Sequence, residues 1–220
     1  MKKIAVIFTS FGPLVNNFKK ILNDTLEDCE LICIADDSLI RDVMRTGAPD
    51  ENVEKRTFLH IESAIAAGAQ MVVIACSSVG QVAQAADAKY SVPVIRIDDA
   101  MAMRAVAAGG KVGVIASLET TIEPTVKLLR QKAEAAGKDV EIISRVAQGA
   151  YQALGSGDPE THDRLVTEAA EQLAKETDVI LLAQGSMARL DEPLNKVIPV
   201  PVLTSPKSCA LAVREMLKSL

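Results

Sequence analysis

Short, continuously apolar runs alternate along the chain with amphipathic stretches. The apolar runs predict eight strands, at about residues 3–9, 30–36, 71–76, 92–97, 111–117, 139–145, 178–184 and 200–204. Between them, apolar residues recur at helical spacing, most clearly over residues 13–27, 51–67, 158–176 and 206–219. Runs that are apolar throughout are typical of parallel strands covered by helices on both faces. The pattern therefore predicts an α/β fold built on parallel sheets.

The second half of the chain repeats the first at a constant offset of 108 residues, since 111 − 3 = 108. The matched blocks are residues 3–7 with 111–115, residues 72–75 with 180–183, residues 92–94 with 200–202, and Gly47 with Gly155. Such a repeat predicts a duplicated unit and two pseudo-symmetric parallel-sheet domains. We expect residues 1–97 to form the first half and residues 98–205 the second. The last helix, 206–220, could pack on the first half.

Composition and charge narrow the function classes. Hydrophobic residues make up 49% of the 220 residues, enough for substantial cores, and aromatic residues only 3%. A net charge of −5, without a run rich in Lys or Arg, gives no electrostatic footprint for nucleic acid. No apolar run approaches the roughly 18 residues of a membrane span, and the four cysteines lack metal-ligand spacing. We therefore expect a cytoplasmic protein that binds neither nucleic acid nor membrane.

Small polar residues follow several of the predicted strands. In open parallel sheets, ligands bind at the carboxyl ends of the strands. The residues that this rule selects are Thr9, Ser10, Cys76, Ser77, Ser78, Ser117, Thr120, Thr121, Gln184, Gly185 and Ser186. If the two halves face each other, the strand ends at Cys76 and Gln184 flank one cleft. We expect the active site there.

Cys76 is the candidate reactive group. A free cysteine in a strand is most often a small buried hydrophobe. Here the thiol falls where the strand meets a loop, and two serines and Gly80 follow it. A helix beginning near Val79 would direct backbone N–H groups at the sulfur or at a bound carboxylate. The repeat partner of Cys76 is Gln184, since 184 − 76 = 108, so the second half offers an amide where the first offers a thiol.

We expect no part in the chemistry for two of the remaining cysteines or for either histidine. Cys33 lies inside an apolar run and Cys209 inside the last helical stretch, so both are expected in cores. His60 lies in a helical stretch, and His162 lies near a helix start and is expected to be solvated. Because both histidines lie away from the predicted strand ends, we expect no Cys–His couple.

These features resemble the Asp/Glu/hydantoin racemase superfamily over essentially the whole chain. The segments ACSSVG, VGVIASLETT and LAQGSMA are similar to the family's motifs. The resemblance implies chemistry without a cofactor, in which one cysteine takes a proton from a carbon acid and a second cysteine delivers one to the opposite face. It also implies that hydroxyls and backbone N–H groups hold the substrate carboxylate, with Ser117 and Thr120 at substrate-binding positions.

The chain departs from the family pattern at the second cysteine. That position falls on Gln184, or on Gly185 in an alternative register, and neither is a thiol. Thr9 replaces a carboxylate of the glutamate racemase branch, and Ser186 lies near where that branch has a histidine, so glutamate racemase activity is not expected.

We expect an isomerase-like enzyme that acts on a small carboxylate or related carbon acid through Cys76, with Gln184 as a neutral hydrogen-bond donor. Three other functions stay open: a decarboxylase, a cis–trans isomerase, and an inactive protein that binds a small ligand. Because members of the family are often dimers, a homodimer also stays open.

Overall fold

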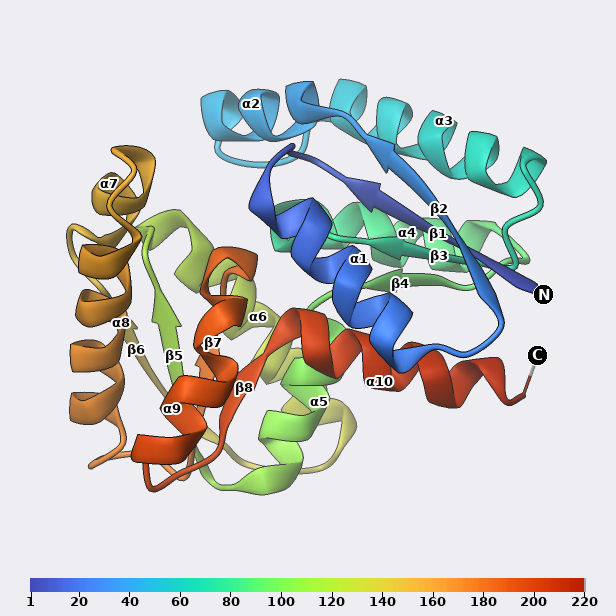
Figure 1. Ribbon diagram of the computed structural model, residues 1–220. Coiled ribbons are helices and arrows are strands. Elements are labelled where there is room, and N and C mark those ends of the chain that lie inside the picture. Colours follow the sequence, from blue (N-terminus) through green and yellow to red (C-terminus); the bar gives the residue numbers. More distant parts are fainter. Residues whose placement is uncertain (220) are drawn as a thin grey trace. The chain divides into compact units, whose positions relative to one another are not determined.

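The computed structural model describes residues 1–219 and shows an α/β protein with two four-stranded parallel sheets (Figure 1). The first half contains β1 (Lys2–Phe8), α1 (Pro13–Thr25), β2 (Cys29–Ala35), α2 (Asp37–Thr46), α3 (Glu51–Ala66), β3 (Met71–Ile74), the 3₁₀ turn η1 (Ser77–Val79), α4 (Gly80–Lys89), β4 (Val94–Arg96) and α5 (Asp99–Ala108). The second contains β5 (Lys111–Ala116), α6 (Glu119–Ala135), β6 (Glu141–Val146), α7 (Ala150–Gly155), α8 (Pro159–Leu173), β7 (Val179–Leu182), the 3₁₀ turn η2 (Gly185–Leu190), α9 (Asp191–Val197), β8 (Val202–Thr204) and α10 (Ser205–Leu217). All eight predicted strands are confirmed.

The two sheets share one strand order. Sheet A runs β2-β1-β3-β4 and sheet B runs β6-β5-β7-β8, with every neighbouring pair parallel. An offset of 108 carries β3 onto β7, since 71 + 108 = 179, and β4 onto β8, since 94 + 108 = 202. The repeat is displaced at β6, which begins at Glu141 although 29 + 108 = 137. The duplication therefore holds at β3 with β7, which carry Cys76 and Gln184 at their ends, and at β4 with β8, and it is displaced at β2 with β6.

The chain divides into two compact units. Unit 1 contains residues 1–97 together with the chain from Cys209 onward, and unit 2 contains residues 98–208. The helix that follows β4, α5, packs in the core of unit 2 through Met101 and Ala105. The helix that follows β8, α10, packs on sheet A through Cys209 and Val213.

Helices cover both faces of sheet A (Figure 1). On one face, α2, α3 and α4 pack Leu39, Ile61 and Ala83 against strand residues that include Ile7 and Ile74. On the other face, α1 and α10 pack against the alternate strand residues, because successive side chains of a strand point to opposite faces. This arrangement is the one that the continuously apolar runs predict.

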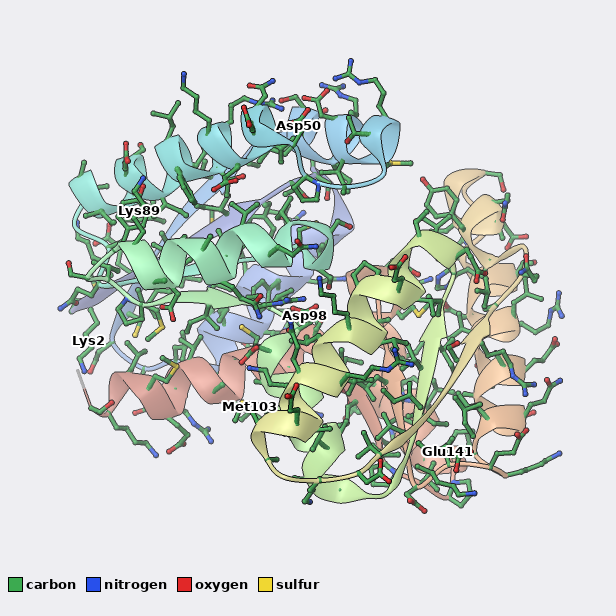
Figure 2. All side chains as sticks on the ribbon, turned by 180° about the vertical axis from the view of Figure 1, so that it is seen from behind. Lys2, Asp50, Lys89, Asp98, Met103 and Glu141 are labelled. Carbon is green, nitrogen blue, oxygen red and sulfur yellow. The ribbon has the colours of Figure 1, made fainter. Side chains whose placement is uncertain are left out.

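The position of α3 on sheet A is fixed by contacts at its start and along its outer side. Asp50, labelled in Figure 2, caps the helix by accepting the Val53 N–H at 2.8 Å. Lys89 of α4, also labelled there, lies 4.4 Å from the centroid of the Phe58 ring. These contacts hold the helix that carries His60.

Two expectations about single residues are wrong. Cys33 is exposed rather than in a core, because β2 is the outermost strand of sheet A. His162 is fully buried rather than solvated, because α8 packs beneath η2. Cys209 is buried in the core, as expected. Among the helices of residues 1–219, none combines the length and the apolarity needed to span a bilayer.

Candidate functional site

The carboxyl edge of sheet A brings Thr9 and Cys76 side by side. β1 pairs with β3 so that Ile7 lies opposite Ile74. Thr9 and Cys76 lie two residues beyond that pair, so they share a row on neighbouring strands, which are about 4.8 Å apart. Ser10, Ser77 and Ser78 follow them directly in sequence. The five candidates of the first half therefore gather at one edge.

Cys76 caps the helical segment that follows β3. Its backbone is extended, with φ −154° and ψ 121°, and η1 continues directly into α4 at Gly80. The side chain is partly buried against the core under α2, α3 and α4. The thiol therefore lies at the start of a helical segment, where unpaired N–H groups can bind an anion.

A buried arginine packs against the same helical start. A Cβ atom added to Gly80 would lie 2.4 Å from the Arg96 Cζ, so the guanidinium occupies the space that a larger residue would fill. Arg96 is only 6% exposed. The guanidinium therefore restricts position 80, at the start of α4, to glycine.

The hydroxyl groups at this edge of sheet A make no hydrogen bonds to other residues among 1–219. Within residues 1–219, the side-chain oxygens of Thr9, Ser10, Ser77 and Ser78 make no hydrogen bond. Hydroxyls elsewhere are used by the backbone: Thr57 donates to the Val53 carbonyl at 2.8 Å. Ser10, Ser77 and Ser78 are partly exposed, so their hydroxyls are available to bind a ligand, whereas Thr9 is only 4% exposed.

The carboxyl edge of sheet B brings Ser117 and Gln184 together. Ile115 pairs with Leu182, so these two residues also share a row beyond the strand ends. The Ser117 N–H and hydroxyl both donate to the Gln184 Oε1, at 2.5 and 2.8 Å. Thr120 is exposed and Thr121 partly buried in the first turn of α6, while Gly185 and Ser186 begin η2.

The contact with Ser117 fixes the orientation of the Gln184 amide. A backbone N–H can only donate, so the atom that it contacts must be the amide oxygen. The Nε2 group then points away from Ser117 and makes no hydrogen bond to any described residue. Gln184 caps η2 with φ −133° and ψ 140°, an extended conformation close to that of Cys76. It therefore presents two N–H donors where Cys76 presents sulfur.

An arginine anchors the turn that follows Gln184. Arg189 donates a hydrogen bond to the Ser186 carbonyl at 2.7 Å and one to each carboxylate oxygen of Asp163, at 2.6 and 3.0 Å. Its Nη2 also lies 3.1 Å from the Nδ1 of buried His162. Sequence reasoning missed this anchor because Arg189 and Asp163 come from separate elements that only the folded chain joins.

A second missed group lies at the edge of sheet A. Asp36, directly after β2, accepts the Ser38 N–H at 3.0 Å and lies 2.9 Å from the His60 Nε2. Burial would raise the pKa of Asp36, but the hydrogen bonds from Ser38 and His60 outweigh it and lower the pKa. His60 therefore does reach a strand end, through its carboxylate partner, although its own sequence neighbours are helical. The one signal in the sequence was the capping pattern Asp36-Asp37-Ser38.

Metal ligands are not grouped in the described part of the chain. Among residues 1–219, no three His, Cys, Asp or Glu side chains are arranged to hold a metal ion. The chemistry on offer at the two edges is that of a thiol, an amide, hydroxyls and backbone N–H groups.

Residues 14–213 match the family model described as Asp/Glu/Hydantoin racemase. The chain belongs to this family. The match includes the three sequence motifs and begins after β1, so the resemblance drawn from those motifs is confirmed.

Solved racemase-family structures share the fold across the whole chain. A glutamate racemase from Bacillus anthracis superposes with a TM-score of 0.76 at 19% identity, covering 99% of this chain and 82% of that one. An aspartate racemase homologue from Pyrococcus horikoshii gives 0.74 at 18% identity, covering 99% and 100%. An allantoin racemase from Klebsiella pneumoniae gives 0.73 at 18% identity, covering 100% and 89%. Among curated proteins, none matches this sequence.

Proposed function

We propose that this racemase-family chain is a cofactor-independent isomerase that acts on a small carboxylate or related carbon acid through the Cys76 thiol. Thr9, Ser10, Ser77, Ser78, Ser117, Thr120, Thr121, Gly185 and Ser186 would bind the substrate, and Gln184 would hold one of its oxygens. The cytoplasm is the proposed location, since the four cysteines are free thiols.

The observation that carries the proposal is the fixed amide of Gln184. Its oxygen is occupied by two donors from Ser117, at 2.5 and 2.8 Å, so its N–H groups are the part left for a ligand. A neutral N–H donor stabilises a developing enolate oxygen without itself exchanging a proton. The thiol and the amide thus suit the two halves of one reaction.

The proton-transfer step follows from these groups. The Cys76 thiolate takes the α-hydrogen, so the C–H bond breaks, an S–H bond forms, and the electron pair moves onto the carbonyl or carboxylate. The resulting enolate oxygen accepts hydrogen bonds from Gln184 Nε2 and from the unpaired hydroxyls. A proton then returns to carbon, either from the Cys76 S–H on the same face or from a donor on the opposite face, and only the second route inverts the carbon.

The test is turnover in deuterated water with a panel of aspartate, glutamate, hydantoins, allantoin, arylmalonate and maleate. Exchange of the α-hydrogen with inversion identifies a racemase, release of CO₂ a decarboxylase, and isomerisation of maleate without exchange a cis–trans isomerase. We expect Cys76→Ala to reduce turnover at least 100-fold, while Cys33→Ala, an exposed thiol of the same sheet, retains it. Full activity of Cys76→Ala would refute the role of the thiol.

One observation favours a second function. Gln184 stands where the family places a second thiol, and an amide cannot act as an acid or base at neutral pH. A protein that binds a small carboxylate without turning it over would keep the hydroxyls and Gln184. Thermal stabilisation by a panel compound, with no change of that compound over days, would support this binding protein and refute the isomerase.

A further inference from the structure

Three strand ends of sheet A form a single row. β1 pairs with β2 so that Ile7 lies opposite Ile34, and with β3 so that Ile7 lies opposite Ile74. Asp36, Thr9 and Cys76 each lie two residues beyond this row. With neighbouring strands about 4.8 Å apart, Asp36 and Cys76 are separated by roughly 10 Å, and Thr9 lies between them.

The members of this row share the face that α2, α3 and α4 cover. Ile34, Ile7 and Ile74 all belong to the core on that face, and side chains two residues apart along a strand return to the same face. Cys76 packs against this core, and Asp36 contacts His60 of α3 there. The thiol and the imidazole are therefore on one side of the sheet.

The carboxylate of Asp36 selects the tautomer of the neutral His60 imidazole. A carboxylate only accepts hydrogen bonds, so the Nε2 atom at 2.9 Å carries the hydrogen. In the neutral ring, Nδ1 then holds a lone pair, and it makes no hydrogen bond to residues 1–219. The His60 side chain is 27% exposed, so the ring is only partly covered by the protein. A carboxylate that orients an imidazole in this way prepares it to act as a base.

Arg56 stabilises the pair from the same helix. It bonds Asp42 and the Ser38 hydroxyl, and its Nη1 lies 3.9 Å from the Asp36 Oδ2. Asp36, Asp42 and Arg56 are the charged groups around His60 in this cluster. The cluster fixes the start of α2, and within residues 1–219 the His60 Nδ1 and the buried Arg56 Nε make no hydrogen bond.

We propose that His60, oriented by Asp36, is the second proton-transfer group of this enzyme and replaces the thiol that Gln184 lacks. The inference rests on the proposed function of Cys76. A substrate carbon bound over Thr9 would have the Cys76 sulfur on one side and the His60 ring on the other. Two groups on opposite sides of one carbon are what inversion at that carbon requires.

The proton balance closes over one turnover. The Cys76 thiolate takes the hydrogen from one face, forming S–H and an enolate, and the His60 imidazolium gives its Nδ1 proton to the other face, forming the new C–H bond. The enzyme is left as thiol and neutral imidazole, which restore their protons by exchange with water. The opposite enantiomer runs the same steps in reverse.

Hydrogen exchange of each enantiomer in deuterated water tests the assignment, using the panel compound that the wild-type enzyme racemises. We expect His60→Gln to reduce racemisation at least 100-fold but to keep exchange, without inversion, for the enantiomer whose hydrogen faces Cys76. Cys76→Ala should keep exchange for the other enantiomer alone. Glu62→Gln, on the same helix, should match the wild type.

Two results would overturn the inference. Racemisation by His60→Gln at the wild-type rate would remove His60 from the reaction. If His60→Gln lost hydrogen exchange equally for both enantiomers and had a lowered melting temperature, His60 would have only a structural role, holding α3 to the start of α2 through Asp36.

A second measurement needs no substrate, so it separates failure of this inference from failure of the proposed function. Iodoacetamide labelling is followed by mass spectrometry of individual cysteines, with exposed Cys33 as internal standard. In the labelling reaction the Cys76 sulfur displaces iodide and loses its proton, and we infer that His60 Nδ1 accepts this proton through a bound water. His60→Gln should then slow labelling of Cys76 at least threefold relative to Cys33. Glu62→Gln should not. An unchanged ratio counts against His60 even if no panel compound reacts.

Discussion

The ends of β3 and β7 have the same backbone and opposite chemistry. Cys76 and Gln184 both cap a 3₁₀ turn with extended φ and ψ, and each shares a row with its neighbour on the adjacent strand. Those neighbours, Thr9 and Ser117, are themselves repeat partners, since 117 − 9 = 108. Ser117 donates two hydrogen bonds to Gln184, whereas the Thr9 hydroxyl makes none within residues 1–219.

The comparison shows which property of a duplicated site follows the fold. Apolar strand residues fix where the strand ends fall, and the strand order repeats with them. The residue beyond each strand end is free to diverge, because it contributes little to the core. At the edge of sheet B, Ser117 donates two hydrogen bonds that fix the Gln184 amide. At the edge of sheet A, the Cys76 thiol makes no hydrogen bond within residues 1–219.

The largest expected effect comes from making the two edges alike. Cys76→Gln would place an amide at both strand ends, with a backbone that already accommodates it at Gln184. We expect turnover of the panel substrate to fall at least 100-fold with little change in melting temperature. A variant that keeps its turnover would show that the thiol is not the reacting group.

The central strands should differ in their tolerance of one methyl group. Gly113 in β5 is the repeat partner of Ala5 in β1, since 113 − 5 = 108, and a Cβ at Gly113 would lie 2.7 Å from the Leu173 Cδ2. Gly113→Ala should therefore destabilise the protein by about 1–3 kcal/mol through overpacking. Urea unfolding measures this, with Ala5→Gly as the reciprocal change. A neutral Gly113→Ala would mean that Leu173 moves aside.

Ser117→Ala removes one of the two donors to Gln184 and leaves the backbone N–H in place. A single neutral hydrogen bond contributes about 1 kcal/mol, so KM for the panel substrate should rise by a factor of roughly five while kcat changes little. Thr9→Val at the other edge is the matched variant. If Ser117→Ala and Thr9→Val changed kcat equally, this would contradict the view that Ser117 acts by orienting Gln184 and that Thr9 does not orient a neighbour.

Asp36 should make stability depend on pH below its ordinary pKa. Because hydrogen bonds hold its folded pKa below 3.8 despite burial, its contribution is present above that value and is lost as the pH falls through the folded pKa. Asp36→Ala should cost about 1 kcal/mol at pH 7, and the difference from wild type should shrink below pH 3.8. Denaturant unfolding across pH measures both, and a constant difference would contradict the assignment.

The sequence predicted the strands well and the partners of polar side chains poorly. Continuous apolar runs locate all eight strands, because burial between two helical layers demands them. The same pattern cannot tell an outer strand from a central one, which is why Cys33 was placed in a core although β2 lies at the edge of sheet A.

The pairings of His60 with Asp36 and of Arg189 with Asp163 were missed for a different reason. Each joins a helix or turn to an element 24 or 26 residues away, so only packing brings the partners together. Local spacing carries no record of such contacts. By contrast, the sequence alone singles out Gln184 as a candidate, because the repeat marks its position opposite Cys76.

The exchange of α5 and α10 between the units has a consequence for the order in which the chain folds. Unit 2 is one continuous segment, but unit 1 lacks Cys209, Val213 and Leu217 until the last helix is made. During synthesis, the apolar face formed by Val6, Phe8 and Val73 is not covered by α10 until that helix has been made. We therefore expect the core of unit 1 to be completed only after every residue of unit 2 has been made.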